Sequence, residues 1–229
     1  YLGETAMLNG NSSIKLLYKI EDLCFDYHHR NARTVTSNIV KQLADTKTMN
    51  FYIFRNKKMP WGDYGNTLLV GYAFPDENDE TKILIERTGP FVPPVYYWSD
   101  YLLISNTMKH KLKQSDLTGF DYQKTYFHKI VDIDWTNWDL TADKPKIYPT
   151  GGEPENYIIT RKHNPKIAET MEPIWALKLS KEVLIGKKDI NATGRQNLFL
   201  IENSWTETDI FQSVNTGFIF LSEKAKIWF

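Results

Sequence analysis

Cysteine is almost absent from this sequence, since Cys24 is the single one among 229 residues. A lone cysteine cannot form an internal disulfide, and a chain of this length without a bridge is typical of a reducing compartment. The sequence also lacks any apolar run near the roughly 20 residues that a membrane-spanning helix needs. We therefore expect a cytoplasmic protein without a membrane segment.

An excess of charge of either sign is also absent. Lys plus Arg number 28 and Asp plus Glu number 28, so the formal net charge is zero. Proteins that bind nucleic acid usually carry a basic excess, because neutralising phosphates supplies much of their affinity. The balance therefore predicts that nucleic acid is not a partner, and the sequence carries no signal of oligomeric state.

Sequence motifs of catalysis are missing as well. The chain has no Gly-x-Ser-x-Gly, no Gly-x-x-x-x-Gly-Lys-Ser/Thr, no Gly-x-Gly-x-x-Gly and no His-Glu-x-x-His. His28 and His29 are adjacent, and neighbouring side chains in a helix or strand point apart, so they are a poor pair of ligands for one metal. We therefore expect no catalytic residues, no cofactor and no metal, and the sequence favours a binding protein over an enzyme.

The residues that are present suit a folded α+β protein. Hydrophobic residues make up 41% of the chain and aromatic residues 14%, which is enough for one sizeable core. We predict a single domain over residues 1–229, with two lobes, 1–98 and 99–229, as the alternative. Predicted strands outnumber helices and do not alternate regularly with long helices, which favours a mixed or antiparallel sheet with short helices.

A β-hairpin is predicted in the first half of the chain. Residues 60–66 form a turn-rich loop by composition, and 67–74 and 82–86 both have the composition of strands. The polar stretch 75–80 between the two strands is typical of a turn.

A unit of strand, serine and helix occurs twice. Residues 101–104 and 218–221 are apolar runs suited to buried strands, and each is followed by a serine and a polar, Lys-containing segment. Ser105 and Ser222 are predicted to be helix N-caps, because a serine hydroxyl can accept a hydrogen bond from a free amide in the first helical turn. Without a gap, the alignment of the two serines places Ala225 on Met108.

Two tryptophans are the candidates for partner binding. Trp135 and Trp138 lie three residues apart among polar residues. Indoles are enriched among the residues that dominate binding energy at interfaces. The alternative is that both indoles cover the core beneath ordered loops.

Two pairs of acids are further candidates. Asp132 and Asp134 would share one face of a strand and so could hold a divalent cation together, although a solvated strand end explains them as well. Glu153 and Glu155 could do acid–base work if their environments separated their pKa values. A turn that leads into a strand at 157–159 is the alternative for this second pair.

The two strand-serine-helix segments carry a family resemblance. Tyr101–Ile133, including Leu117–Tyr122, and Gly217–Phe229, preceded by Asp209-Ile210-Phe211, resemble a group of bacterial immunity proteins from polymorphic toxin systems. The resemblance covers under half of the chain. Glu86–Phe91 and the N-terminal third have no counterpart in it.

The resemblance implies a cytosolic protein that binds its cognate toxin and neutralises it sterically, with no catalytic residues to carry over. The alternative function is an enzyme that acts on sugars or glycans. It would use the Asp-x-Asp pair at Asp132 and Asp134, or the carboxylates of Glu153 and Glu155.

Overall fold

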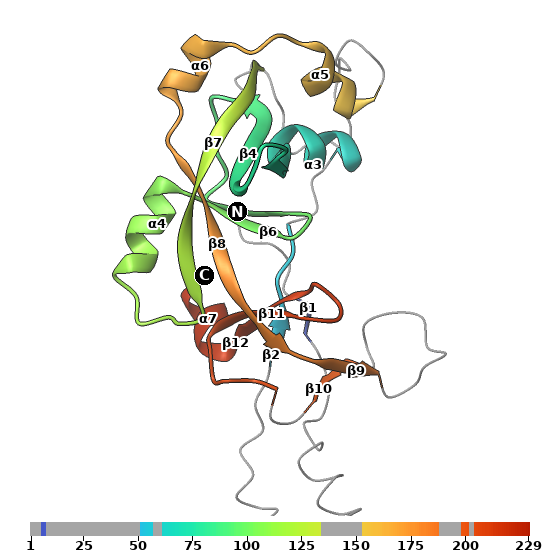
Figure 1. The fold of residues 1–229 in the computed structure, drawn as a ribbon, viewed down its shortest axis with the longest axis vertical. Coiled ribbons are helices and arrows are strands. Elements are labelled where there is room, and N and C mark those ends of the chain that lie inside the picture. The colour runs from blue at the N-terminus through green and yellow to red at the C-terminus, as the bar shows by residue number, and fades with distance from the viewer. Residues whose placement is uncertain (1–5, 8–50, 57–60, 134–152, 188–197, 202–203) are drawn as a thin grey trace, which may run out of the picture. The chain divides into compact units, whose positions relative to one another are not determined.

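The computed structural model describes residues 6–7, 51–56, 61–133, 153–187, 198–201 and 204–229. Over these residues the chain forms a mixed sheet with a few short helices, which confirms the predicted α+β class (Figure 1). None of the helices in this described part is long and apolar enough to cross a membrane.

The chain divides into two compact units that are interleaved in sequence. One unit comprises residues 1–4 and 54–180, and the other comprises 5–53 and 181–229. A boundary between residues 98 and 99 would fall inside the first unit. The single domain over 1–229 stays a prediction, and each unit is described below by itself.

The first unit is built on strands of both orientations. Its strands are β3 (Tyr72–Asp76), β4 (Asp79–Gly89), β5 (Val95–Trp98), β6 (Tyr101–Ser105), β7 (Phe120–Asp132) and most of β8 (Ile174–Val183). Its helices are α3 (Asp63–Val70), α4 (Asn106–Lys113), α5 (Pro154–Thr160) and α6 (Pro165–Thr170).

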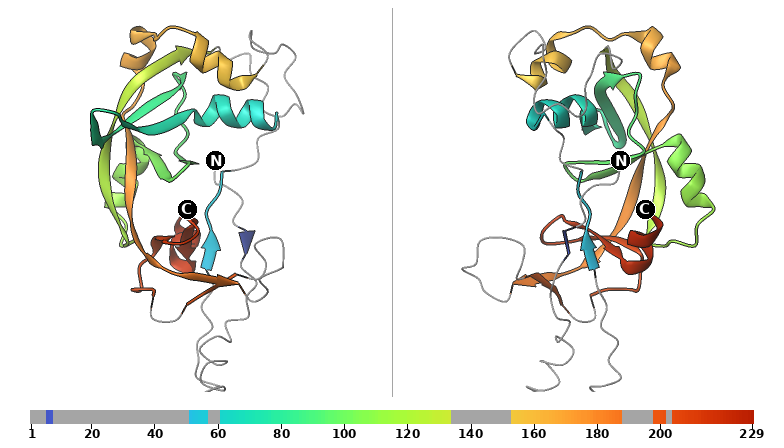
Figure 2. Two further views of the ribbon diagram at one scale, coloured as in Figure 1. Left: turned by 45° about the vertical axis from the view of Figure 1, so that its right-hand side comes forward. Right: turned by 180° about the vertical axis from the view of Figure 1, so that it is seen from behind.

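Strand β7 changes partners along its length. Residues 120–124 pair antiparallel with β8, and residues 125–132 pair parallel with β4. β3 pairs antiparallel with β4, while β6 lies between β5 and β8 and is antiparallel to both. The main core of this unit packs among these strands and against α6, which lies beside β7 in Figures 1 and 2. It contains Ile83, Ile85, Leu103, Ile130 and Ile174, all at most 2% exposed.

The second unit is smaller. Its elements are β1 (Ala6–Met7), β2 (Phe51–Ile53), β9 (Ile185–Lys187), β10 (Leu198–Leu200), β11 (Ile210–Ser213), β12 (Ile219–Ser222) and α7 (Glu223–Trp228). β2 pairs antiparallel with β1 and β12, β12 with β11, and β9 with β10. Phe211 and Phe220 stack with ring centroids 5.6 Å apart at the centre of its core.

The predicted hairpin is confirmed, but the strand before its turn begins later than predicted. β3 and β4 are antiparallel neighbours, whereas residues 67–70 belong to helix α3 instead of a strand, and α3 begins at Asp63 inside the predicted loop. The strand predicted at 157–159 is also wrong, because these residues are helical in α5, which has Pro154 in its first turn.

Helix α3 is joined to β4 by side-chain hydrogen bonds. The Arg87 side chain is fully buried, and its Nη2 donates to the carbonyl oxygens of Leu69 and Phe91, both at 2.8 Å. The hydroxyl of Thr88 donates to the Leu68 carbonyl oxygen. Carbonyls in the last turn of a helix lack partners within the helix. Arg87 and Thr88, which are consecutive in β4, supply donors to two of these carbonyls of α3.

Gly71 allows this close approach. Its φ is +70°, and a Cβ atom built there would lie 2.4 Å from Arg87 Cβ. Any other residue would meet both the backbone strain and the clash.

The repeated unit of strand, serine and helix is confirmed in both places, as α4 and α7. Ser105 Oγ accepts from the Met108 amide at 3.2 Å, and Ser222 Oγ accepts from the Ala225 amide at 3.1 Å. The caps share their backbone geometry, with φ and ψ of −69° and 160° at Ser105 and −66° and 166° at Ser222. Both predicted N-caps are therefore correct.

The similarity extends to a whole hairpin before each serine. β5 and β6 precede Ser105, and β11 and β12 precede Ser222. The Ser105 amide donates to the Pro94 carbonyl oxygen at 3.0 Å, and the Ser222 amide donates to that of Asp209 at 2.8 Å. Each hairpin thus ends in the same register, and we call β5–β6–α4 the first module and β11–β12–α7 the second module.

Candidate functional site

Three of the candidate residues predicted from sequence, Asp134, Trp135 and Trp138, lie outside the described residues. Asp132 is the last residue of β7, and its side chain is exposed. Its carbonyl oxygen accepts a hydrogen bond from the Tyr157 hydroxyl at 2.9 Å. The structure therefore joins the end of β7 to helix α5.

Glu153 and Glu155 lie at the start of α5. Glu153 is the N-cap residue but makes no side-chain capping bond, and Glu155 is in the first turn. The positive end of the helix dipole favours carboxylates at these positions, which gives both residues a structural reason to be there.

A buried hydroxyl lies near this end of the sheet. Burial, together with the charges of Glu155 and Glu86, raises the pKa of Tyr72 to about 12. The Tyr72 ring packs edge-on against Trp98, with centroids 5.1 Å apart. At neutral pH Tyr72 is therefore a neutral side chain and no proton acceptor.

Metal-binding geometry is not found in the described residues. These contain no group of three or more His, Cys, Asp or Glu side chains that could hold an ion. The Glu86 carboxylate accepts a hydrogen bond from His128 Nδ1 at 2.7 Å. The two serines of the modules are engaged in capping bonds, as shown above.

The first module carries a cluster of lysines on aromatic rings. Lys109, on the fourth position after Ser105, lies over the ring of Trp175, and its Nζ is 5.4 Å from the centre of the Tyr122 ring. Lys113, one helical turn later, lies 5.9 Å from the same tyrosine ring. Lysines attracted to the faces of aromatic rings in this way form cation–π contacts.

The cluster continues along β7. Tyr122, Lys124 and Tyr126 alternate with residues of the opposite face, so they share one face of the strand. Lys124 is directly opposite Trp175 on β8, and its Nζ lies 5.2 Å from the centre of the Tyr126 ring. We call Lys109, Lys113, Tyr122, Lys124, Tyr126 and Trp175 the lysine–aromatic face. Figure 1 shows α4 beside β7 and β8, the strands that contribute to it.

The cations of this face have no acidic partner among the residues that the structure describes. Lys113 and Lys124 are exposed, and Tyr126 is 41% exposed. Neither these lysines nor Lys109 forms an ion pair with any residue that the structure describes. Burial, and then the like charge of Lys113, lower the pKa of Lys109. The positive charges of Lys109 and Lys113 therefore repel each other.

The second module repeats the contact but pairs its cations. Lys226, again the fourth residue after the serine, lies 4.0 Å from the centre of the Tyr52 ring. Tyr52 is opposite Leu221, just as Trp175 is opposite Ile104, so the two rings hold equivalent positions. Lys226 also pairs with Glu223 at 3.9 Å.

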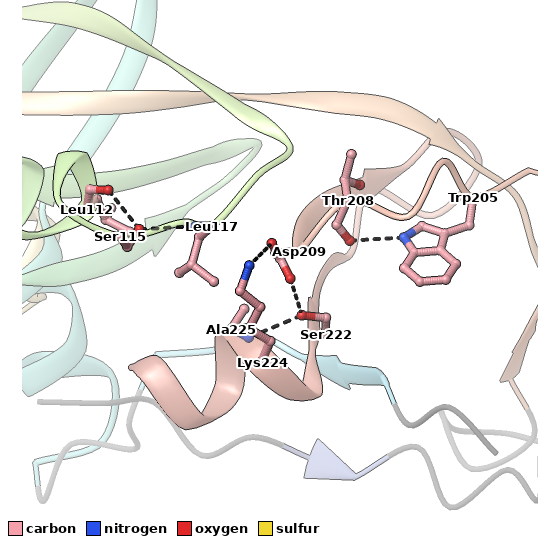
Figure 3. Close-up of polar contacts among 9 residues, drawn as sticks. All are labelled: Leu112, Ser115, Leu117, Trp205, Thr208, Asp209, Ser222, Lys224 and Ala225. Carbon is pink, nitrogen blue, oxygen red and sulfur yellow. Dashed lines mark hydrogen bonds and ion pairs between the residues drawn. The ribbon is translucent and has the colours of Figure 1, made fainter. Parts of the chain in front are cut away.

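A second ion pair neutralises Lys224 of this module. Its Nζ lies 3.3 Å from Asp209 Oδ2 (Figure 3). At the positions of Asp209 and Glu223 the first module has Pro94 and Asn106, which carry no charge. The same fold element is therefore compensated in one unit and left basic in the other.

The sequence alone does not single out the lysine–aromatic face. The one hint of it in the sequence is that every second residue in 109–113 is a lysine, a pattern that by itself predicts only a polar helix. Tyr122, Lys124 and Trp175 come from distant segments, and only the strand pairing brings them together.

Comparison of the chain with protein-family models, with curated proteins and with solved structures gives no match.

Proposed function

We propose that this chain is a non-catalytic binding protein of the cytoplasm that neutralises a cognate toxin by covering the toxin's active site. The observation that carries the proposal is the pair of Ser-capped modules, because the residues of the family resemblance lie within or beside these two modules. The residues that carry the resemblance thus lie in or beside two structural elements with a common hydrogen-bond pattern, which supports the proposal.

The hydrogen bonds of Ser222 give its hydroxyl a structural role. Ser222 Oγ accepts from the Ala225 amide and donates to Asp209 Oδ1 at 2.8 Å, so both of its hydrogen-bonding roles are used (Figure 3). Here the hydroxyl fixes the start of a helix.

A neutralising complex would bury about 800 Å² on each partner. Exposed aromatic residues would contribute most of the affinity, and Trp135 and Trp138 remain our candidates for this role beside Tyr126. The zero net charge and the single cysteine agree with a cytoplasmic protein whose partner is another protein.

The test is co-expression with the product of a toxin-like reading frame next to the gene of this chain. We expect that product to arrest growth when expressed alone, and growth to return when this chain is expressed with it. The purified pair should form a 1:1 complex. Toxicity that persists in cells containing folded, soluble protein of this chain would overturn the proposal.

A further inference from the structure

We infer that the lysine–aromatic face is the docking surface for an acidic patch on the partner protein. This inference rests on the proposed function and adds the place and the chemistry of the contact. The three lysines of the face are Lys109, Lys113 and Lys124, and they form no ion pair among the described residues.

The second module serves as an internal comparison. Both modules have the hairpin register, the serine cap and the lysine over an aromatic ring. In the second module, Asp209 and Glu223 pair with Lys224 and Lys226. The fold of a module is therefore compatible with paired lysines. Lys109 is buried, but Lys113 of the first module and Lys124 of β7 are exposed and can meet carboxylates from outside.

The surroundings of these lysines favour a protein as the partner. Tyr126 is 41% exposed, and the strand register continues from it to Leu84 and Phe74, which are partly exposed. An aromatic and aliphatic strip beside charged residues is the usual composition of a protein interface. Nucleic acid would require a longer basic track, and the chain as a whole has no basic excess.

Charge complementarity of this kind acts mainly on the rate of association. Opposite charges steer the two proteins together, and the effect weakens as salt screens them. The acidic patch would meet Lys113 and Lys124 at the rim, while Tyr126 enters the apolar centre of the contact.

The experiment measures association with the purified product of the adjacent reading frame at low and at high ionic strength. The test variant is Lys113→Glu with Lys124→Glu. The matched control is Lys111→Glu with Lys162→Glu, which makes the same change of net charge at two exposed lysines outside the face. Lys111 is also in the last turn of α4, so the effect on the helix dipole is matched at one of the two positions.

We expect the test variant to associate about tenfold more slowly at low ionic strength and to lose most of its salt dependence. The control should keep the wild-type rate within about twofold. Circular dichroism and the melting temperature should be unchanged in both. Tyr126→Ala should raise the dissociation rate without altering the salt dependence.

The outcomes separate the two proposals. If the wild type neutralises the toxin and the test variant binds as fast as the control, the docking surface is wrong and the function stands. If the wild type neither binds nor neutralises, both proposals fail. Binding of a single-stranded oligonucleotide that is lost in the test variant alone would replace the protein partner by nucleic acid and overturn the inference.

Discussion

The hydroxyl of Ser222 donates a hydrogen bond to Asp209 Oδ1 at 2.8 Å, at the open end of the β11–β12 hairpin (Figure 3). Asp209 is 7% exposed, so this bond lies in a protected environment. Ser105 caps its helix in the same way, but Pro94 occupies the position of Asp209 and has no side-chain acceptor. The same cap therefore has one additional bond in the second module.

The two serines should differ in their contribution to stability. Ser105→Ala should lower the free energy of unfolding by about 1 kcal/mol through loss of the cap. Ser222→Ala should cost about 2 kcal/mol, because a buried carboxylate also loses a donor. Denaturant titration measures both. Glycine at either site should lower the free energy of unfolding less than alanine, since glycine is a better N-cap residue. Equal losses of stability in the two alanine variants would contradict the assigned bond to Asp209.

Arg87 should be one of the most sensitive positions in the first unit. Its guanidinium donates to the carbonyl oxygens of Leu69, Thr88 and Phe91 at 2.8 to 2.9 Å. Burial lowers its pKa, so methionine would relieve the cost of a buried charge but would remove all of these donors. We expect Arg87→Met to destabilise the protein by about 3 kcal/mol in chemical denaturation.

Lys113→Met is the control for the loss of one charge on the surface. It should change stability by less than about 0.5 kcal/mol, because the side chain is exposed. A change of that size for Arg87→Met as well would show that the carbonyls of α3 do not depend on Arg87.

Tyr72 should make stability depend on pH at alkaline values. Its pKa in the folded protein is raised to about 12, against 10.0 for an unperturbed tyrosine. The unfolded chain therefore loses this proton first, and the contribution of Tyr72 to stability is full below pH 10 and is lost as pH rises toward 12. The melting temperature of Tyr72→Phe should fall less steeply than that of the wild type over this interval.

At neutral pH the same substitution should be nearly harmless. The Tyr72 hydroxyl is buried and has no hydrogen-bond partner among the described residues, and phenylalanine keeps the ring that packs on Trp98. We expect a change of less than about 1 kcal/mol. A larger loss of stability would indicate a bond to this hydroxyl.

Trp135 and Trp138 are predicted to act in binding. Replacing both by alanine should weaken the complex with the adjacent reading frame's product by at least about 30-fold, the effect expected of hot-spot residues. Calorimetric titration of wild type and variant measures it. Unchanged affinity, with an unchanged melting temperature, would remove the two tryptophans from the interface without affecting the proposed function.

The local parts of this fold were predictable from sequence. A serine between an apolar run and a polar segment marks both modules, because the capping bond joins residues only three apart and needs nothing else from the chain. The β3–β4 hairpin is likewise a short-range feature, with a polar turn between two apolar runs.

Contacts between distant segments set the remaining features of the fold and of the candidate site. Leu68 and its neighbours have the composition of a strand, yet they are helical. Arg87 and Thr88, which follow their acceptors by 18 and 20 residues, supply donors to the last carbonyls of α3. From sequence alone, the lysines of α4 are predicted to lie on an ordinary solvent-exposed helix. Their role depends on which strand lies beneath them, and the register of β7 with β8 places Lys124 against Trp175, within the same cluster as Lys109. A pattern of residues determines local hydrogen bonds, but the neighbours of a charge are set by strand pairing between distant segments.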